Sequence, residues 1–277
     1  MANTALVWIR DDFRIQNNDA LTYATNQHDV VTAVFIFNSN IFDHKREAQK
    51  WWVSKSLENF KSDLKKLNIG LEIIKDDEIN FFSKIKSNSK ISVYWNKVYE
   101  PNELEKDKKI GANFSKKNID FKFFKGNVLN EYNKITKNDG TPFKVFSPFW
   151  RNAEQFYLER LPDKINKVKK CKKINTLFKN QIKSEDILPK SDWYKKFEKY
   201  WEPSEQKAHE NLDNFVNKSI LNYGVDRDFP SIKGTSLLSP YIRNGQINVG
   251  DIWQKCKKLK SNNVSVKKYT NEIGWRE

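Results

Sequence analysis

The sequence contains few of the residues that build covalent cross-links or metal sites. Its 277 residues include two cysteines and three histidines. Cys171 and Cys256 stand far apart, and His28, His44 and His209 are isolated from one another. A disulfide framework or a zinc site needs more such side chains at closer spacing. We therefore expect a protein without disulfides and without bound metal.

Long apolar runs are absent as well. The apolar start, Met1–Trp8, is soon followed by Arg10, Asp11 and Asp12, so it is too short for a secretory signal peptide. No later stretch approaches the roughly 20 apolar residues of a membrane-spanning helix. These absences argue against a membrane or secreted protein and predict a cytoplasmic one.

Basic residues outnumber acidic ones, 50 to 35, which gives a formal net charge of +15. A surplus of this size favours a polyanionic partner, and nucleic acid is the first candidate. Lysine, asparagine and isoleucine are abundant throughout, however, as an AT-rich genome would produce in any protein. Composition alone leaves both interpretations open.

The first 125 residues alternate between strand-like and helix-like patterns. Five short segments rich in β-branched and aromatic residues are typical of buried strands: Ala5–Ile9, Val30–Phe37, Leu71–Ile74, Ile91–Trp95 and Ile119–Phe124. Such alternation predicts a doubly wound α/β domain, with a five-stranded parallel sheet covered by helices on both faces. Sheets of this kind bind ligands at the carboxyl ends of their strands.

The clearest helical stretch between the strands starts near Arg46. Its apolar residues recur every three or four positions and form a single stripe: Val53, Leu57, Phe60, Leu64 and Leu67. Asn68 and Gly70 are expected to end this helix.

The remaining chain is predicted to fall into two parts after a first domain of residues 1–130. Residues 131–203 contain a turn at Asn138–Pro142 and a lysine-rich stretch at Lys164–Lys183, so we expect a solvated connector. Residues 204–277 have a helical pattern with no returning strand. The first helix there should present Ala208, Leu212, Phe215, Ile220 and Leu221 on an apolar face.

The segment Tyr223–Ile247 carries the most specific chemistry. Thr235, Ser236 and Ser239 place three hydroxyls within five residues, and Ser239-Pro240 is a favourable helix start. Hydroxyls and free backbone N–H groups at such a point predict a bound phosphate or diphosphate. The alternative is that Ser239 only caps a helix.

The string GTSLLSPYI in this segment, preceded by Tyr223 and Arg227 and followed by Gly245, resembles the FAD-binding signature of the DNA photolyase/cryptochrome family. Three other stretches agree with it: Leu6–Arg14, Pro142–Phe149 and Trp201–Glu205, the last with Ser204 where glycine is usual. The resemblance implies that FAD is the cofactor and that Arg227 lies on the DNA-binding face. With the closing segment, it implies eight FAD-binding residues: Tyr223, Thr235, Ser236, Leu237, Leu238, Ser239, Tyr269 and Arg276.

The closing segment, YTNEIGWRE, bears on substrate. On a helix Tyr269, Glu272, Trp275 and Arg276 would share one face, which is also a pattern of ordinary amphipathic packing. The resemblance implies that Glu272 and Trp275 are catalytic and line the cavity for a flipped pyrimidine dimer. An indole offers a stacking face to an unstacked base, and a carboxylate can hydrogen-bond a pyrimidine edge. Tyr269 stands where the family more often has Trp or Phe.

A second cofactor site is implied near the end of the fourth predicted strand. There Asn102 and Glu103 match an Asn-Glu pair that holds 5,10-methenyltetrahydrofolate, a light-harvesting antenna, in folate-using members of the family. The alternative is that Asn102 caps the next helix together with Glu105.

The resemblance implies a deoxyribodipyrimidine photo-lyase, a carbon–carbon lyase that acts on UV-damaged DNA, as a monomer without membrane contact. A cryptochrome-like blue-light receptor without repair activity is the alternative. Family members continue well beyond Glu277, which implies an incomplete helical FAD-binding domain, so we expect the isolated chain to be inactive.

Overall fold

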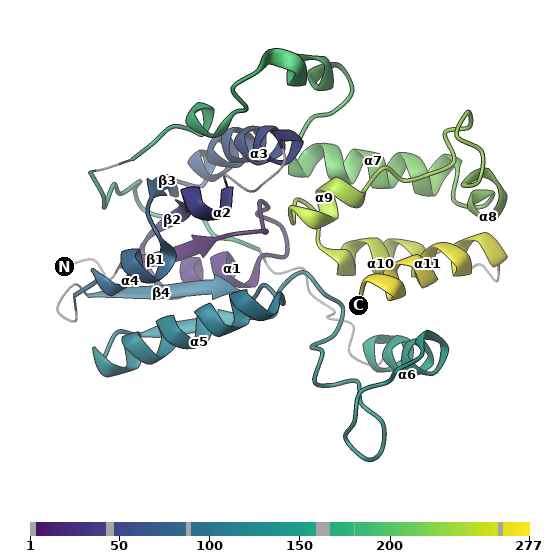
Figure 1. The fold of residues 1–277 in the computed structure, drawn as a ribbon, viewed down its shortest axis with the longest axis horizontal. Helices are drawn as coiled ribbons and strands as arrows, with labels where there is room; N and C mark the ends of the chain where they lie inside the picture. The colour runs from purple at the N-terminus through teal and green to yellow at the C-terminus, as the bar shows by residue number, and fades with distance from the viewer. Residues whose placement is uncertain (1–3, 43–46, 87–89, 159–166, 180, 260–262) are drawn as a thin grey trace.

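The computed structural model describes residues 4–42, 47–86, 90–158, 167–179, 181–259 and 263–277 (Figure 1). A sheet with its covering helices forms one part of the molecule, and a group of helices forms the other (Figure 1). Residues 125–204 connect the last strand of the first part to the first helix of the second part.

The sheet has five strands, all parallel, in the order β3-β2-β1-β4-β5. They are β1 Thr4–Ile9, β2 Val30–Phe37, β3 Gly70–Lys75, β4 Ile91–Asn96 and β5 Phe121–Phe124. The predicted doubly wound α/β fold is therefore confirmed. The last strand begins two residues later than predicted, because Ile119 instead fills the core below the sheet.

Helices cover both faces, and the alternation of side chains along each strand decides which face each residue serves. Ala5, Val7 and Ile9 of β1 pack toward α1 (Asp19–Gln27) and α3 (Glu47–Lys66). Leu6 and Trp8 pack toward α4 (Glu78–Ser83) and α5 (Pro101–Lys116) on the other side. A further short helix, α2, spans Ser39–Phe42.

Helix α3 carries the predicted apolar stripe, while Arg46 lies outside the described residues. Its end differs in part from the prediction. Asn68 adopts the left-handed conformation with φ 58°, as a residue that ends a helix often does. Gly70 plays no part in the termination, because it is already the first residue of β3.

The predicted connector is more ordered than expected. It contains α6 (Phe146–Leu158) and two 3₁₀ helices, Ser184–Ile187 and Asp192–Lys199. Trp150, Ala153 and Tyr157 of α6 pack into the helical core. Further on, the backbone N–H groups of Leu177 and Phe178 donate to the Glu72 carboxylate of β3 at 2.6 and 2.9 Å. Lys164 lies outside the described residues.

The described residues of the last part of the chain contain five helices: α7 Glu205–Lys218, α8 Tyr223–Asp226, α9 Ser239–Arg243, α10 Val249–Lys257 and α11 Val264–Arg276. Their core includes the predicted Ala208, Leu212, Phe215 and Ile220. Leu221 was wrongly assigned to this face and is 54% exposed, because α7 ends at Lys218 and the chain turns there.

The two parts are joined at the loop after β1. Gly245 has φ +64°, and a Cβ there would lie 1.9 Å from the carbonyl oxygen of Asp11. The Arg14 guanidinium donates to the carbonyl of Gly245 at 3.0 Å, and the Phe13 N–H donates to that of Asn244 at 3.3 Å. This close backbone approach sets the distance between the sheet and the helices.

Within the described ranges, no helix is both long and apolar enough to cross a membrane. No group of three or more histidine, cysteine, aspartate or glutamate side chains suited to a metal ion occurs in that part of the chain.

Candidate functional site

A wide cleft of about 1050 Å³ lies where the sheet meets the helices. One wall comes from residues that follow the carboxyl ends of β1 and β4, including Asp11, Lys97 and Tyr99. The opposite wall comes from α8, α9, α11 and the loop before α9. The cleft therefore occupies the sheet edge at which α/β folds bind ligands.

Seven of the eight residues expected at FAD line this cleft together: Tyr223, Thr235, Ser236, Leu237, Ser239, Tyr269 and Arg276. Leu238 does not line it. Its side chain is 1% exposed and belongs to the helical core, so only its backbone could take part in binding. Thr235 and Tyr269, which are 34 positions apart in the sequence, thus lie on one surface.

The hydroxyl-rich turn enters α9 differently from the prediction. The helix begins at Ser239, but the cap position is Leu238, and no side chain makes a capping hydrogen bond. The capping role expected of Ser239 is therefore wrong. Leu237 has φ +54°, an unfavourable conformation for a leucine, and its side chain is exposed. Strain of this kind gathers at ligand sites, and here it places the Ser236 and Ser239 side chains on the cleft.

Tyrosines form the apolar floor of the cleft. The rings of Tyr223 and Tyr269 meet edge to face at 5.1 Å, and Phe215 packs on Tyr269 at 4.6 Å. Burial raises the pKa of the Tyr269 hydroxyl, and a side-chain hydrogen bond with Ser236 opposes the shift. Both tyrosines are therefore neutral near pH 7 and offer flat rings beside the hydroxyl-rich turn.

Glu272 and Arg227 are paired with each other. The Arg227 guanidinium donates to the Glu272 carboxylate at 2.5 Å and lies over the Tyr223 ring, 5.2 Å from its centroid. Glu272 lines the cleft, whereas Arg227 does not. Both groups remain partly exposed, so the pair is held weakly and can be exchanged for a ligand contact.

Trp275 lies apart from the cleft, contrary to the expectation that it shares a pocket with Glu272. Its ring stacks on Phe146 of α6 instead. Helix geometry explains the difference, because successive residues are about 100° apart. Arg276 thus lies about 20° from Tyr269 around the axis, Glu272 about 60° and Trp275 about 120°.

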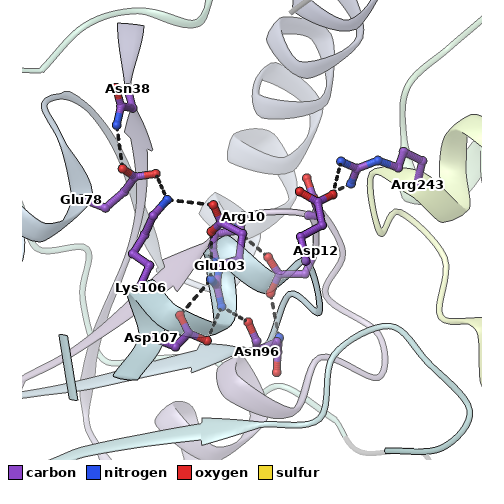
Figure 2. Close-up of polar contacts among 11 residues, drawn as sticks. Arg10, Asp12, Asn38, Glu78, Asn96, Glu103, Lys106, Asp107 and Arg243 are labelled. Atoms are coloured by element: carbon purple, nitrogen blue, oxygen red, sulfur yellow. Dashed lines mark hydrogen bonds and ion pairs between the residues drawn. The ribbon is translucent and has the colours of Figure 1, made fainter. Parts of the chain in front are cut away.

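A polar network fills the sheet edge beside the cleft (Figure 2). The Arg10 guanidinium pairs with Glu103 at 3.3 Å and with Asp107 at 2.9 Å. Lys106 bridges Glu103 at 2.8 Å and Glu78 at 2.9 Å. Each charged side chain in this network, including Glu103, has an oppositely charged partner.

This network does not fit the expected folate site. The pocket at Glu103 measures about 140 Å³, against the ~300–1,000 Å³ usual for small-molecule sites. Asn102 is exposed and does not line it. The alternative capping role of Asn102 is wrong, since α5 begins at Pro101 with Glu100 at the cap position.

Arg243 connects the two pockets and was not anticipated. Its guanidinium pairs with Asp11 and, at 3.2 Å, with Glu100, and all three residues line both the small pocket and the cleft. Asp11 follows a predicted strand, and this position was the sequence signal that could have placed it near the cleft. No sequence signal pointed to Arg243, because both of its partners are far away in the sequence.

Comparisons with known proteins agree on one family. Residues 5–167, more than half of the chain, match the family described as DNA photolyase. A deoxyribodipyrimidine photo-lyase of Agrobacterium fabrum is 30% identical over 98% of this chain, and cryptochrome-2 of Arabidopsis thaliana is 25% identical over 94%. The crystal structure of a bacterial class III photolyase from Agrobacterium tumefaciens superimposes on all of this chain with a TM-score of 0.88 and 28% identity.

The chain spans only part of these relatives. It covers 57% of the Agrobacterium fabrum protein, 44% of the Arabidopsis protein and 58% of the solved structure.

Proposed function

The chain belongs to the DNA photolyase family, and on that basis we propose that it serves deoxyribodipyrimidine photo-lyase activity. This activity is the light-driven, FAD-dependent repair of cyclobutane pyrimidine dimers in DNA. The observation that carries the proposal is the cleft, because seven side chains named from the sequence alone line it together.

The residues present fit FAD. The cleft volume of about 1050 Å³ slightly exceeds the ~300–1,000 Å³ range for small-molecule sites, which leaves room for a dinucleotide. Bound reduced FAD would supply the light-driven electron that splits a dimer. Thr235, Ser236 and Ser239 would hold the diphosphate through their hydroxyls, with the backbone amides of Leu237 and Leu238 beside them. Tyr223 and Tyr269 would pack on the cofactor, and Arg276 would add positive charge.

On the substrate side, Glu272 would accept a hydrogen bond from a pyrimidine edge. Its present partner, Arg227, would then turn to a DNA phosphate. In this exchange Arg227 meets a charged phosphate, while the partly exposed Glu272 carboxylate keeps a hydrogen bond to the neutral base. Trp275 lies outside the cleft and stacks on Phe146 of α6.

We also propose that three successive parts of the chain have different roles. Residues 1–130 form the α/β domain, 131–203 the connector, and 204–277 the helical part that binds FAD. No folate antenna is included, because Glu103 is held by Arg10 and Lys106.

A cryptochrome-like photoreceptor is the second candidate. The similarity to cryptochrome-2 favours it, as does the closed Arg227–Glu272 pair, which leaves Glu272 engaged. Binding to DNA with and without a dimer separates the two candidates, because a receptor without repair activity has no reason to prefer the damaged strand.

An FAD titration tests the cofactor site. The wild-type chain should bind FAD saturably, and a Ser236→Ala, Ser239→Ala double variant should bind at least about tenfold more weakly, since hydrogen bonds to charged groups contribute ~1.5–3 kcal/mol each. Ser115→Ala, on the exposed face of α5, is the matched control. Equal affinities for all three would refute the assignment. Dimer loss under blue light, against a dark control, then tests the reaction. Because this chain spans 57% of the Agrobacterium fabrum relative, repair is expected only from a protein that also includes the remaining part.

A further inference from the structure

A third pocket, of about 700 Å³, lies between β3, α4 and the connector. Its floor is apolar, since Ile74, Phe81 and Ile85 are only 5–6% exposed. The ring of Phe178, from the connector, meets the Phe81 ring edge to face at 4.9 Å and closes one side. Among the described residues, none that lines this pocket also lines the cleft or the small pocket at Glu103, so it is a separate site.

The connector wall of this pocket is fixed by backbone contacts with the edge strand β3. The N–H of Phe178 donates to the Glu72 carboxylate at 2.9 Å. Shortly after it, the Ile182 N–H donates to the carbonyl of Ile73 at 2.9 Å, and Gln181 forms an antiparallel bridge with Ile74. These contacts hold the Phe178 ring against α4, and the pocket is therefore preformed, as small-molecule sites usually are.

The rim of the pocket is basic. Four exposed lysines line it: Lys75, Lys84, Lys86 and Lys179. Asp76 also lines it, but its carboxylate is already paired with Lys84 at 2.6 Å. The other three lysines form no ion pair with any residue that the structure describes. The pocket thus combines an apolar floor with three positive charges that lack an acidic partner.

We propose that this pocket binds a small amphipathic anion, a hydrocarbon body that carries one carboxylate, sulfonate or phosphate group. The floor side chains offer no hydrogen-bonding group, so a body with polar ring atoms would lose its bonds to water without replacement. The lysines would meet the anionic group at the mouth, and they would repel a cation. The volume lies within the ~300–1,000 Å³ usual for small-molecule sites. The proposal does not depend on flavin, light or DNA.

The test uses anilinonaphthalene sulfonate, an amphipathic anion whose fluorescence rises in apolar surroundings. Wild-type protein should enhance its emission saturably, and decanoate should displace it. Decanol has the same chain length and no charge, so displacement by decanol should require a concentration about tenfold higher. This ratio between the two ligands isolates the contribution of the lysines, because the probe is the same in both titrations.

Two variants separate the charge from the apolar floor. A Lys75→Gln, Lys179→Gln double variant leaves one of the three unpaired lysines, so the tenfold preference for decanoate should fall to about twofold. Phe178→Ala removes one wall and should weaken both ligands about tenfold. A Lys61→Gln, Lys65→Gln double variant is the matched control, because it removes two exposed charges from α3, across the sheet from α4.

The control should keep the wild-type preference for decanoate. Should Phe178→Ala fail to fold, the two lysine variants still decide the matter, since their side chains are exposed. Equal displacement by decanoate and decanol from the wild type would overturn the proposal. So would the same preference in the pocket and control lysine variants, because the probe would then bind elsewhere, and so would the absence of saturable binding by the wild type.

Discussion

Replacing Gly245 by alanine tests how the cleft is assembled. The new Cβ would lie 1.9 Å from the Asp11 carbonyl oxygen and 2.7 Å from the Asp12 Cα, so the two parts of the molecule must separate locally. The left-handed backbone adds ~1–2 kcal/mol for a residue with a Cβ. Separation also weakens the hydrogen bond from Arg14, worth ~1.5–3 kcal/mol, and that from Phe13, worth ~0.5–1.5 kcal/mol.

Together these terms predict a loss of roughly 3–6 kcal/mol in the free energy of unfolding. Gly140 provides the matched control, because it also has a positive φ, +79°, but no atom lies within 4 Å of its added Cβ. Gly140→Ala should therefore cost only the backbone strain of ~1–2 kcal/mol. Urea unfolding followed by circular dichroism measures both variants.

The Gly245→Ala substitution should also alter the cleft. Arg243 contacts Asp11 across this junction, so displacement of the loop should also weaken FAD binding, while Gly140→Ala should leave it unchanged. Equal losses of stability for the two alanine variants would refute the reasoning, because steric contact would then contribute nothing.

Three further predictions follow from charged side chains. Arg227→Ala should weaken binding to damaged and undamaged DNA alike and reduce the slope of log affinity against log salt by about 1, as loss of one phosphate contact does; an unchanged slope in a salt titration would contradict this. Glu272→Ala should lower repair per absorbed photon more than it lowers affinity for damaged DNA, which actinometry alongside a binding titration measures; equal losses would remove its proposed contact with the reacting base. Burial raises the pKa of Glu205, although the N–H groups of Ile15 and Gln16 donate to it. The folded state therefore binds the Glu205 proton more tightly than the unfolded state does. The resulting stabilisation is complete below the ordinary pKa of a glutamate and is lost as the pH rises through the raised pKa of Glu205. Glu205→Gln should flatten that decline in a series of urea unfolding curves, and an unaltered pH profile would count against it.

Local sequence patterns were sufficient for the α/β domain. The strands around β1 and β2 are short, β-branched and bounded by polar turns, and burial on both faces of a parallel sheet requires such residues. The stripe from Val53 to Leu64 likewise corresponds to the buried face of α3. In both cases the information lies within one element, so periodicity alone reveals it.

Patterns that depended on a single angle or boundary were less secure. Trp275 was grouped with Glu272 by spacing, but it lies about 120° from Tyr269 around the helix axis and stacks on Phe146 instead. Leu221 lies outside the core because α7 ends three residues before it, at Lys218. Asn102 lies within α5 and not at its cap position, because Pro101 is the first residue of the helix.

The sequence by itself determined the fold class, the family and the side chains that gather at the cleft, because each is written in a contiguous motif or a local period. Only the tertiary structure decided which charges are already paired and which aromatic rings meet. Glu103 is engaged by Arg10, Arg243 by Asp11 and Trp275 by Phe146, each across more than 90 residues. Such contacts depend on how separate elements pack, and no local pattern encodes the distance between two chain segments that meet only in the folded state.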